Sequence, residues 1–490
     1  MQIVDAGQFD NYWKSRVTTA ETRPDDEGTV DSRVREIIEA VRSKGDAAVR
    51  RYAQRFDKSS PEKLEVPTGM AEAAWEALRK TERKLAAAME LAAFHIRDFA
   101  ELQRKQFADF ETEMDEGLFT GQRIIPVERA AVYVPAGRFP LFSSVLMGML
   151  PALAAGVEEL VLASPPMEDG FPAPRIMAAA ALAVSLDRGK MAAGAESPQA
   201  RLRIFAMGGA QAIAALALGT ESVPRASVII GPGNKYVAAA KRMLFGEVGI
   251  DFVAGPTDVL IIVDHGAADV SKAGAAVTGS MSAGTTAGPA EIIAADMLAQ
   301  AEHDPDARAR ALVPNSGMAE KISTALERRL AALPEESRAI AGASLDAGGL
   351  IVVYKTREEA IRIANIIAPE HLELHSENPG GWTSGTGDRL KNYGSLFTGA
   401  LAAEVLGDYS AGVNHTLPTS GSARFTGGLS VRHFLKTVTT LRCTTGAGFE
   451  KARKAAEILG RAEGLIAHSR AAYERTVYEQ RRSNEQRIPE

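Results

Sequence analysis

The chain has 490 residues, too many for one ordinary hydrophobic core, so two or three domains are expected. Its 46% hydrophobic and 24% charged residues are typical of a folded globular protein and exclude a disordered or fibrous one. The net charge of −6 gives no basic excess for nucleic-acid binding, and the single cysteine, Cys443, excludes a disulfide framework or a multi-thiolate metal site. Any metal ligands must therefore come from His, Asp, Glu or Gln.

The N-terminal segment carries Asp10, Lys14 and Arg16 and lacks the apolar core that a signal peptide needs. Two uncharged stretches, 139–157 and 204–220, approach membrane-spanning length, but each contains glycine and polar residues. Buried elements of a folded core explain both stretches better than membrane helices do. We therefore expect a cytoplasmic protein with no membrane or nucleic-acid partner.

From about Ser32 to Thr112 the pattern is helical. Apolar residues recur at spacings of three and four, as in Val34, Ile37 and Val41, with charged residues between them. Residues 1–125 are therefore predicted to form a mainly helical N-terminal region.

Beyond Arg123 short β-rich runs alternate with Ala-rich segments. The predicted strands are Ala130–Val134, Glu159–Ala163, Arg203–Ala206, Ser227–Ile230, Val259–Val263 and Leu350–Tyr354, and a helix is expected from Arg357. Strands that alternate with helices favour parallel βαβ units. The pattern predicts an α/β fold with two Rossmann-like doubly wound domains, at 126–256 and 257–430.

The last segment, Phe449–Ser483, is again helical and charged, with little apolar surface for a core of its own. We expect residues 431–490 to form a helical C-terminal segment that packs on something else, a second subunit being one option. Two other stretches, Leu186–Leu202 and Lys272–Pro289, look inserted into the alternating pattern.

Four of the eight histidines have ordinary surroundings in the sequence and are interpreted as surface or satisfied core side chains: His95, His265, His375 and His433. The other four occur in more suggestive surroundings.

Gln300 and His303 are three residues apart in a predicted helix and share a face, as two ligands of one metal must. A helix-end histidine that caps carbonyl groups is an equally good interpretation. Glu370 and His371 follow Pro369 directly, and an adjacent acid and imidazole suit proton transfer near neutral pH. His415 lies in a polar, turn-rich stretch typical of a site loop.

Eight segments, taken in order, resemble the active-site and cofactor segments of the histidinol dehydrogenase family. They are Tyr133–Gly137, Gly208–Ala215, Gly231–Val237, Gly249–Pro256, Asp296–His303, Ala368–Leu374, Gly407–Thr419 and Arg461–His468. The resemblance extends from about Val30 to His468.

The resemblance implies one zinc ion per subunit, held by Gln300, His303, Asp408 and His468. Two imidazoles, a carboxylate and an amide oxygen suit a borderline cation that must still admit substrate.

The resemblance also makes Glu370 and His371 the catalytic acid/base pair, with His371 the principal proton acceptor. The implied substrate contacts are Thr257, Gln300, His303, His371, Glu404, Asp408, His415, Glu463 and His468. In the family the C-terminal ligand and its neighbouring glutamate come from the partner subunit, which implies a homodimer with shared sites.

For NAD the resemblance points to Tyr133, Gln211 and Asn234. The usual Gly-x-Gly-x-x-Gly fingerprint is absent from the predicted βαβ region. Glycine-rich turns at Gly208 and Gly231 would let backbone approach the dinucleotide instead, although a purely structural tight turn explains each one equally well.

The family oxidises an alcohol to a carboxylate through a bound aldehyde, using two NAD. The resemblance thus implies an NAD-dependent alcohol dehydrogenase that converts L-histidinol to L-histidine, the last steps of histidine biosynthesis. This chain departs from the biosynthetic pattern at Ala136, at Thr257-Asp258 and at Thr426-Gly427.

These departures leave open the same four-electron oxidation of another small alcohol, such as 2,3-dihydroxypropanesulfonate, the substrate of a sulfopropanediol dehydrogenase. A sulfonate would require a basic group in the pocket. A non-catalytic dimeric NAD-binding or scaffold protein is a third interpretation, and it predicts a site with missing groups.

Overall fold

The computed structural model describes residues 1–490 apart from 22–23, 137–139, 192–200, 267–287, 385–388 and 486–490. Most of the two stretches that look inserted in the sequence, Leu186–Leu202 and Lys272–Pro289, therefore lies outside the described residues.

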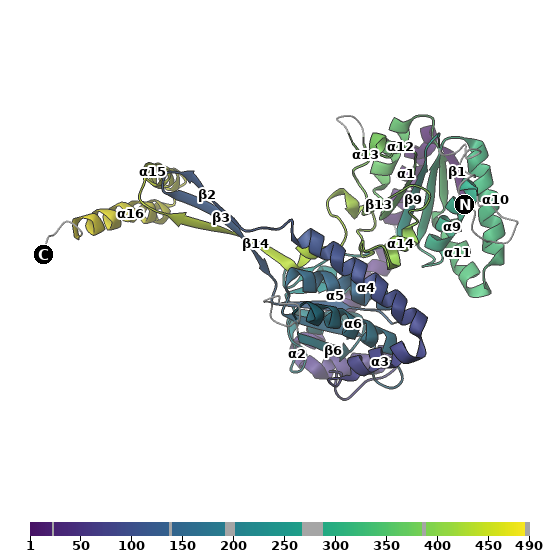
Figure 1. Ribbon diagram of the computed structural model, residues 1–490, viewed down its shortest axis with the longest axis horizontal. Helices are drawn as coiled ribbons and strands as arrows, with labels where there is room; N and C mark the ends of the chain where they lie inside the picture. The colour runs from purple at the N-terminus through teal and green to yellow at the C-terminus, as the bar shows by residue number, and fades with distance from the viewer. Residues whose placement is uncertain (22–23, 137–139, 192–200, 267–287, 385–388, 486–490) are drawn as a thin grey trace. The chain divides into compact units, whose positions relative to one another are not determined.

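The chain divides into two compact units. The first comprises Met1–Arg104 and Val127–Phe434, and the second comprises Lys105–Pro126 and Leu435–Glu490. The first unit holds two parallel sheets and the second a small antiparallel sheet (Figure 1). Among the described helices, none is long and apolar enough to cross a membrane.

One parallel sheet has five strands in the order β6-β5-β4-β7-β8. The strands are β4 (Arg129–Tyr133), β5 (Glu159–Ser164), β6 (Arg201–Ala206), β7 (Val228–Ile230) and β8 (Gly249–Ile250). β5 is buried along its whole length, as expected of a parallel strand covered on both faces. The strand order reverses beside β4, and such a reversal favours ligand binding at the carboxyl ends of the strands.

Helices cover both faces of this five-stranded sheet. On one face α2 (Pro24–Phe56), α7 (Gly209–Leu218) and α8 (Lys235–Leu244) contact one another. The other face carries α3 (Met70–Thr81), α4 (Arg83–Arg104), α5 (Phe142–Ala155) and α6 (Pro174–Met191). The apolar stripe of α2, including Val34, Ile37 and Val41, packs in one core with Ala131 and Val161 of the sheet.

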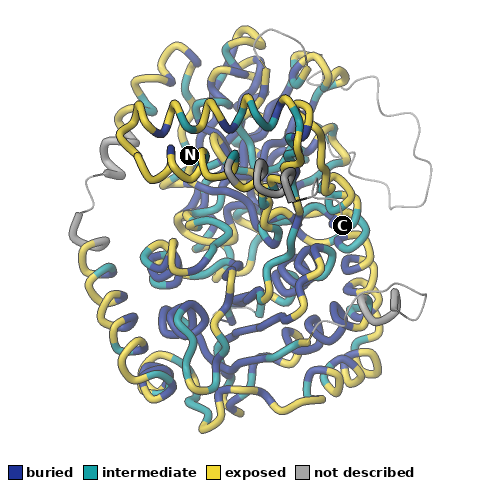
Figure 2. Tube along the Cα trace, turned by 90° about the vertical axis from the view of Figure 1, so that its left-hand side faces the viewer, coloured by how far each residue is buried: buried dark blue, intermediate teal, exposed yellow. Residues whose placement is uncertain are grey.

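The other parallel sheet has six strands in the order β1-β11-β10-β9-β12-β13. The strands are β1 (Gln2–Asp5), β9 (Asp258–Val263), β10 (Arg308–Val313), β11 (Leu350–Val353), β12 (His371–His375) and β13 (Ser395–Thr398). Burial is continuous along the central strands and alternates along the helices (Figure 2).

Alternate residues of β9 separate the two cores of this six-stranded sheet. Val259, Ile261 and Val263 pack with α9 (Pro289–Ala301), α10 (Ser316–Ala332) and α11 (Glu335–Gly348). Leu260 and Ile262 pack with α1 (Ala6–Glu21) and α12 (Arg357–Ile367). The remaining short helices of the first unit are α13 (Gly380–Thr383), α14 (Glu404–Tyr409), η1 (Ser422–Arg424) and η2 (Val431–Phe434).

The second unit consists of an antiparallel sheet in the order β14-β3-β2 and two helices that pack on each other. Its elements are β2 (Phe110–Asp115), β3 (Leu118–Pro126), β14 (Leu435–Cys443), α15 (Ala447–Ala462) and α16 (Ile466–Glu485).

The six predicted strands and the helix from Arg357 are present within a residue or two of their expected bounds. One short strand near the N-terminus was not foreseen, and two expected element bounds were wrong. Residues 2–5 form β1, a strand of the six-stranded sheet, inside the region expected to be mainly helical. The predicted helix up to Thr112 stops at Arg104, and β2 follows. The segment 431–490, expected to be helical, begins with β14, whose Val438 and neighbouring threonines favour a strand.

Candidate active site

The candidate acid/base pair lies at the amino ends of β9 and β12. Glu370 immediately precedes β12, His371 is its first residue, and His371 pairs in register with Val259 of β9. Just upstream, Ala368 ends α12 with φ of 50°, a left-handed conformation that residues other than glycine rarely adopt. This strained turn before Pro369 directs the chain from α12 into the site.

Glu370 is held by reciprocal hydrogen bonds to the start of β9. Its Oε2 accepts from Thr257 Oγ1 at 2.5 Å and from the Asp258 N–H at 3.0 Å, while Asp258 Oδ1 accepts from the Glu370 N–H at 3.1 Å. Asp258 also pairs with Arg310 at 3.1 Å. Burial raises the pKa of Glu370 to about 7, although His371 and the Thr257 hydroxyl oppose that shift.

His371 is buried among carboxylates. Its Nδ1 lies 3.9 Å from Glu370 Oε2 and its Nε2 lies 3.5 Å from Asp408 Oδ1, distances of ion pairs rather than short hydrogen bonds. Among the described residues neither ring nitrogen has a hydrogen-bond partner. Burial alone would lower the pKa of His371, but the carboxylates, with Glu404 first, raise it to about 10.

Three of the candidate metal ligands and one candidate substrate contact come together beside His371. Ligand atoms of His303, Glu404 and Asp408 all lie within 4.8 Å of one another. Gln300 is fully buried on the last turn of α9, and His303 follows one residue after the helix cap. The side chains of this cluster therefore come from the end of α9 and from α14.

The Gln300 amide bridges the metal-ligand candidates and the acid/base pair. Its nitrogen donates to Thr257 Oγ1 at 2.7 Å, and the Thr257 hydroxyl donates in turn to Glu370, so the amide oxygen faces Glu404 and the metal-ligand candidates. In the opposite orientation the nitrogen would donate to Glu404 Oε1 at 2.7 Å and the oxygen would accept from the Asp258 N–H at 3.2 Å. Burial and the neighbouring carboxylates raise the pKa of Glu404 well above its ordinary value, although the nearby His371 opposes that shift.

His415 closes another side of the same cluster. Its Nδ1 lies 2.9 Å from the backbone oxygen of Asp408 and its Nε2 lies 3.2 Å from Ser144 Oγ on α5. Burial lowers the pKa of His415 below its ordinary value, so the ring is a neutral donor and acceptor. Sequence reasoning missed Ser144, because a serine in the first turn of an apolar helix carries no signal of its own.

The two remaining candidates for the metal and substrate site, Glu463 and His468, belong to the second unit of the chain. Glu463 caps the C-terminal end of α15, and His468 lies in the first turn of α16. Both side chains are exposed.

The candidate NAD residues lie at the carboxyl edge of the five-stranded sheet. Gln211 and Asn234 line a cavity of about 520 Å³ together with Arg33, Ile37, Tyr52, Arg55, Phe56 and Tyr236. The hydroxyl of Tyr133 accepts a hydrogen bond from the N–H of Gly209, another lining residue, at 3.1 Å. Arg33 and Arg55 were missed from the sequence, because in α2 they look like ordinary solvated charges.

Asn234 also has a structural role. It is the N-cap of α8, and its Oδ1 accepts from the N–H groups of Tyr236 and Val237 at 3.0 and 3.1 Å. Asp57 is a further group that sequence reasoning missed: it interacts with Gly208 and Gln211, and burial raises its pKa to about 6.

The histidines interpreted as ordinary have identifiable contacts. His95 Nδ1 lies 2.7 Å from the backbone oxygen of Ser410, and His433 bonds within the turn at Ser430. For His375 the sequence offered no obvious partner, and the structure provides one. Its Nε2 lies 3.3 Å from Glu373 Oε2 on the same buried strand.

Comparisons with known proteins point to one family. The family model for histidinol dehydrogenase matches residues 20–476. The histidinol dehydrogenase of Thermus thermophilus is 41% identical over 444 residues, which cover 90% of this chain and 94% of that protein. That of Prochlorococcus marinus is 40% identical over 436 residues, covering 89% of this chain and 88% of that protein.

A solved structure gives the same result in three dimensions. The crystal structure of histidinol dehydrogenase from Elizabethkingia anophelis superposes with a TM-score of 0.77 at 32% sequence identity, over 92% of each chain. Sequence and fold thus match the same group of oxidoreductases over nearly the full length, and the chain belongs to the histidinol dehydrogenase family.

Proposed function

We propose that this protein oxidises L-histidinol to L-histidine through a bound aldehyde, in two hydride transfers to NAD. The observation that carries the proposal is the buried Glu370–His371 pair, which lies directly beside the His303–Glu404–Asp408 cluster. An acid/base pair next to a group of metal-type donors is what an alcohol oxidation with an oriented substrate requires.

In the proposed reaction His371 accepts the alcohol proton while hydride leaves for the nicotinamide ring. The ring must be neutral to act as a base, yet the surrounding carboxylates raise the pKa of His371 to about 10. Cationic groups that enter the site with substrate and cofactor offset those carboxylates and lower that pKa toward neutrality. Glu370, whose pKa is about 7, then takes a proton from the water that hydrates the aldehyde.

The donor set fits the zinc ion that the family implies. We propose that Gln300, His303 and Asp408 hold it, together with His468 from a second copy of the chain. Two imidazoles, a carboxylate and an amide oxygen are ligands that zinc accepts. When bound, the ion would supply a fixed positive charge that orients the nitrogen and oxygen donors of the substrate.

Contribution of His468 by a second subunit is supported by the surface of the C-terminal unit. Near the exposed His468 and Glu463, large apolar side chains are exposed too: Ile458, Leu459, Leu465, Ile466 and Tyr473. Exposed apolar clusters of this kind mark protein–protein contacts. We therefore propose that residues 431–490 serve homodimerisation.

For NAD we propose the cavity lined by Gln211 and Asn234, next to Tyr133, whose hydroxyl accepts from the lining residue Gly209. Arg33 and Arg55 supply positive charge for a pyrophosphate, and Tyr52 and Phe56 supply apolar surface for an aromatic ring. The strand order of both parallel sheets, which reverses beside β4 and beside β9, supports the description as two Rossmann-like domains, 126–256 and 257–430.

The charge of the site separates the two candidate substrates. Glu370, Glu404 and Asp408 are buried together around His371, and Arg310, which also contacts this network among the described residues, is already engaged by Asp258. This excess of carboxylates favours a cationic amino alcohol over 2,3-dihydroxypropanesulfonate, which would need a free basic group. The non-catalytic interpretation loses support, because every predicted acid/base and metal-ligand residue is present.

The test is the kcat/KM for NADH production with each alcohol, measured on zinc-loaded protein. We expect turnover of L-histidinol, its loss in His371→Asn, and no turnover of the sulfonate. Turnover of the sulfonate alone would show that the sulfonate, not L-histidinol, is the substrate of the same reaction. Inactivity with both alcohols would contradict the proposed function.

A further inference from the structure

Buried polar side chains continue along β12 and α9 beyond the catalytic pair. His371, Glu373 and His375 alternate along β12 and therefore point to the same face of the sheet. Leu372 and Leu374 between them pack in the opposite core, with α1 and α12. The polar face is thus the one that α9 covers.

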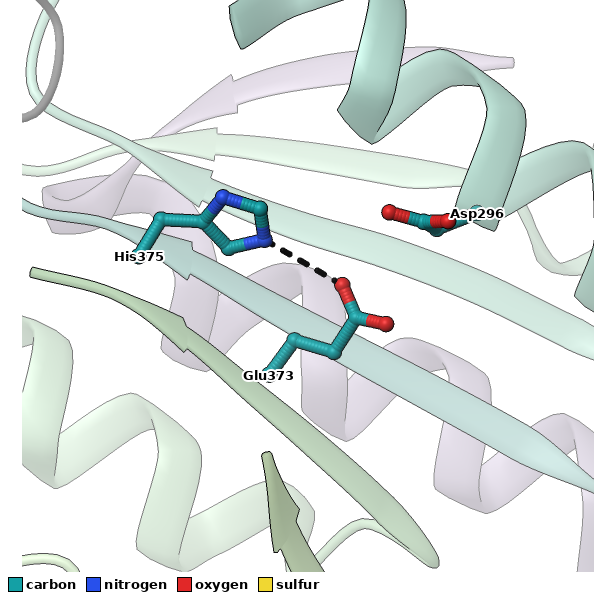
Figure 3. A group of neighbouring side chains, drawn as sticks. All are labelled: Asp296, Glu373 and His375. Atoms are coloured by element: carbon teal, nitrogen blue, oxygen red, sulfur yellow. Dashed lines mark hydrogen bonds and ion pairs between the residues drawn. The ribbon is translucent and has the colours of Figure 1, made fainter. Parts of the chain in front are cut away.

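Asp296 of α9 completes a compact group with two of these residues. It lies one helical turn before Gln300, and its relative exposure is 9%, against 1% for Glu373 and 6% for His375. One ligand atom from each of the three side chains lies within 4.8 Å of the others. Figure 3 shows the Asp296 carboxylate pointing from the helix toward the side chains that rise from β12.

The group has an unmet polar atom. Among the described residues no hydrogen-bond partner reaches Asp296 Oδ2, although that atom is buried. Burial raises the pKa of Asp296 to about 7, and the negative charge of Glu373 contributes to this shift. The charge of Arg329 lowers the pKa of Asp296, but Arg329 already forms an ion pair with Glu291 at 3.1 Å. Two buried carboxyl groups therefore share one imidazole, and when both are ionised one negative charge has no cation to balance it.

We propose that Asp296, Glu373 and His375 form a second metal site, for a divalent transition-metal ion such as Zn²⁺ or Mn²⁺. One imidazole nitrogen and two carboxylate oxygens are donors that these ions accept. The 3.3 Å between His375 Nε2 and Glu373 Oε2 matches the spacing of roughly 3.3 Å between neighbouring ligands of a tetrahedral ion with bonds of about 2.0 Å. The ion supplies the positive charge that Asp296 lacks.

The site would also anchor part of the candidate active site. The other oxygen of Glu373, Oε1, accepts the N–H of Glu404 at 2.9 Å. Glu404 is the first residue of α14, the helix that carries Asp408. An ion that fixes the Glu373 carboxylate therefore also fixes the start of α14, and the second site serves a positioning role rather than a catalytic one.

The experiment counts metal ions per chain by plasma mass spectrometry, after loading the full-length protein with Zn²⁺ and removing unbound metal by gel filtration. We expect two ions for the wild type and one for Asp296→Asn and for His375→Gln. His303→Ala is also expected to retain one, because it removes a ligand of the other proposed site. Asp346→Asn, an exposed aspartate of α11, is the matched control and keeps two.

The two sites fail independently in this design. If the wild type binds one ion and both Asp296→Asn and His375→Gln lose it, the second site stands and the first does not. If the cluster variants bind as many ions as the wild type, the proposal is overturned.

A measurement on the wild-type protein tests the same proposal if the variants do not fold. A zinc-edge anomalous difference map of zinc-loaded crystals should show a peak enclosed by Asp296, Glu373 and His375. A map without that peak overturns the proposal.

Discussion

Glu370 and Thr257 show how single contacts set the chemistry of this site. The carboxylate is buried, which favours its neutral form, yet it accepts two hydrogen bonds at its Oε2, which favour the charged form. The balance brings its pKa to about 7, where a carboxyl group can both accept and release a proton.

A pH dependence follows from this pKa. Water activation needs the carboxylate, which predominates above about pH 7 and is lost as the pH falls through that value. We expect kcat for oxidation of the aldehyde intermediate to decline below about pH 7, with one proton taken up. In Glu370→Gln this acid limb should be absent and the rate low throughout. An unchanged limb in the variant would assign the titration to another group.

Replacement of Thr257 by valine tests the hydrogen bond to Glu370 directly. Valine has nearly the same shape but cannot donate, so the charged form of Glu370 loses a partner. A hydrogen bond to a charged group contributes about 1.5–3 kcal/mol, which corresponds to about one to two pH units. The acid limb of the same pH profile should move upward by that amount, and Thr324→Val, an exposed position on α10, should leave it in place. A limb that stays in place in both variants would contradict this role.

At the scale of elements, the local pattern was sufficient for most of the parallel strands. β4, β5 and β9 each contain a short unbroken apolar run after a charged first residue, as expected of a strand covered on both faces. β1 and β14 escaped prediction because their pairing is not local. β1 joins β11 nearly 350 residues later, and β14 pairs with β3 more than 300 residues earlier.

Asn234 both caps α8 and lines the candidate NAD cavity, and the two roles can be separated by mutation. Asn234→Ala removes the cap of α8 and should cost about 1 kcal/mol of unfolding free energy. Asn234→Asp keeps the cap, so its stability should match the wild type within about 0.5 kcal/mol. Its added negative charge beside the cavity should nevertheless weaken NAD binding, measured by fluorescence titration. NAD affinity equal to the wild type in the aspartate variant would remove Asn234 from the cofactor site.

At the scale of the candidate site, the sequence indicated the chemistry but not the geometry. The order of the eight segments predicted roles for Gln300, His303, Glu370, His371 and Asp408. Ser144, which contacts His415, and Arg33, Arg55 and Asp57, which lie beside the candidate NAD residues, could not be found, because only the packing of α2 and α5 on the sheet brings them there. The alternation of His371, Glu373 and His375 is visible in the sequence. That Asp296 joins Glu373 and His375 follows only from the packing of α9 on that face of the sheet.

For the whole molecule, the account makes His468 a ligand contributed by a second copy. His371→Asn and His468→Asn homodimers should each be inactive. In a mixed dimer, one of the two sites receives both wild-type residues and the other receives neither. Subunit exchange at a 1:1 ratio should therefore restore about one quarter of wild-type activity. With both homodimers inactive, no recovery despite proven exchange would mean that His468 acts within its own chain.

The most direct test of the central claim is the stoichiometry of the complete reaction. A limiting amount of L-histidinol is converted by the zinc-loaded protein with excess NAD, and NADH and the amino-acid product are both quantified. The account predicts two NADH and one L-histidine for each L-histidinol consumed, with no free aldehyde. One NADH per alcohol with aldehyde released, or no NADH at all, would contradict it.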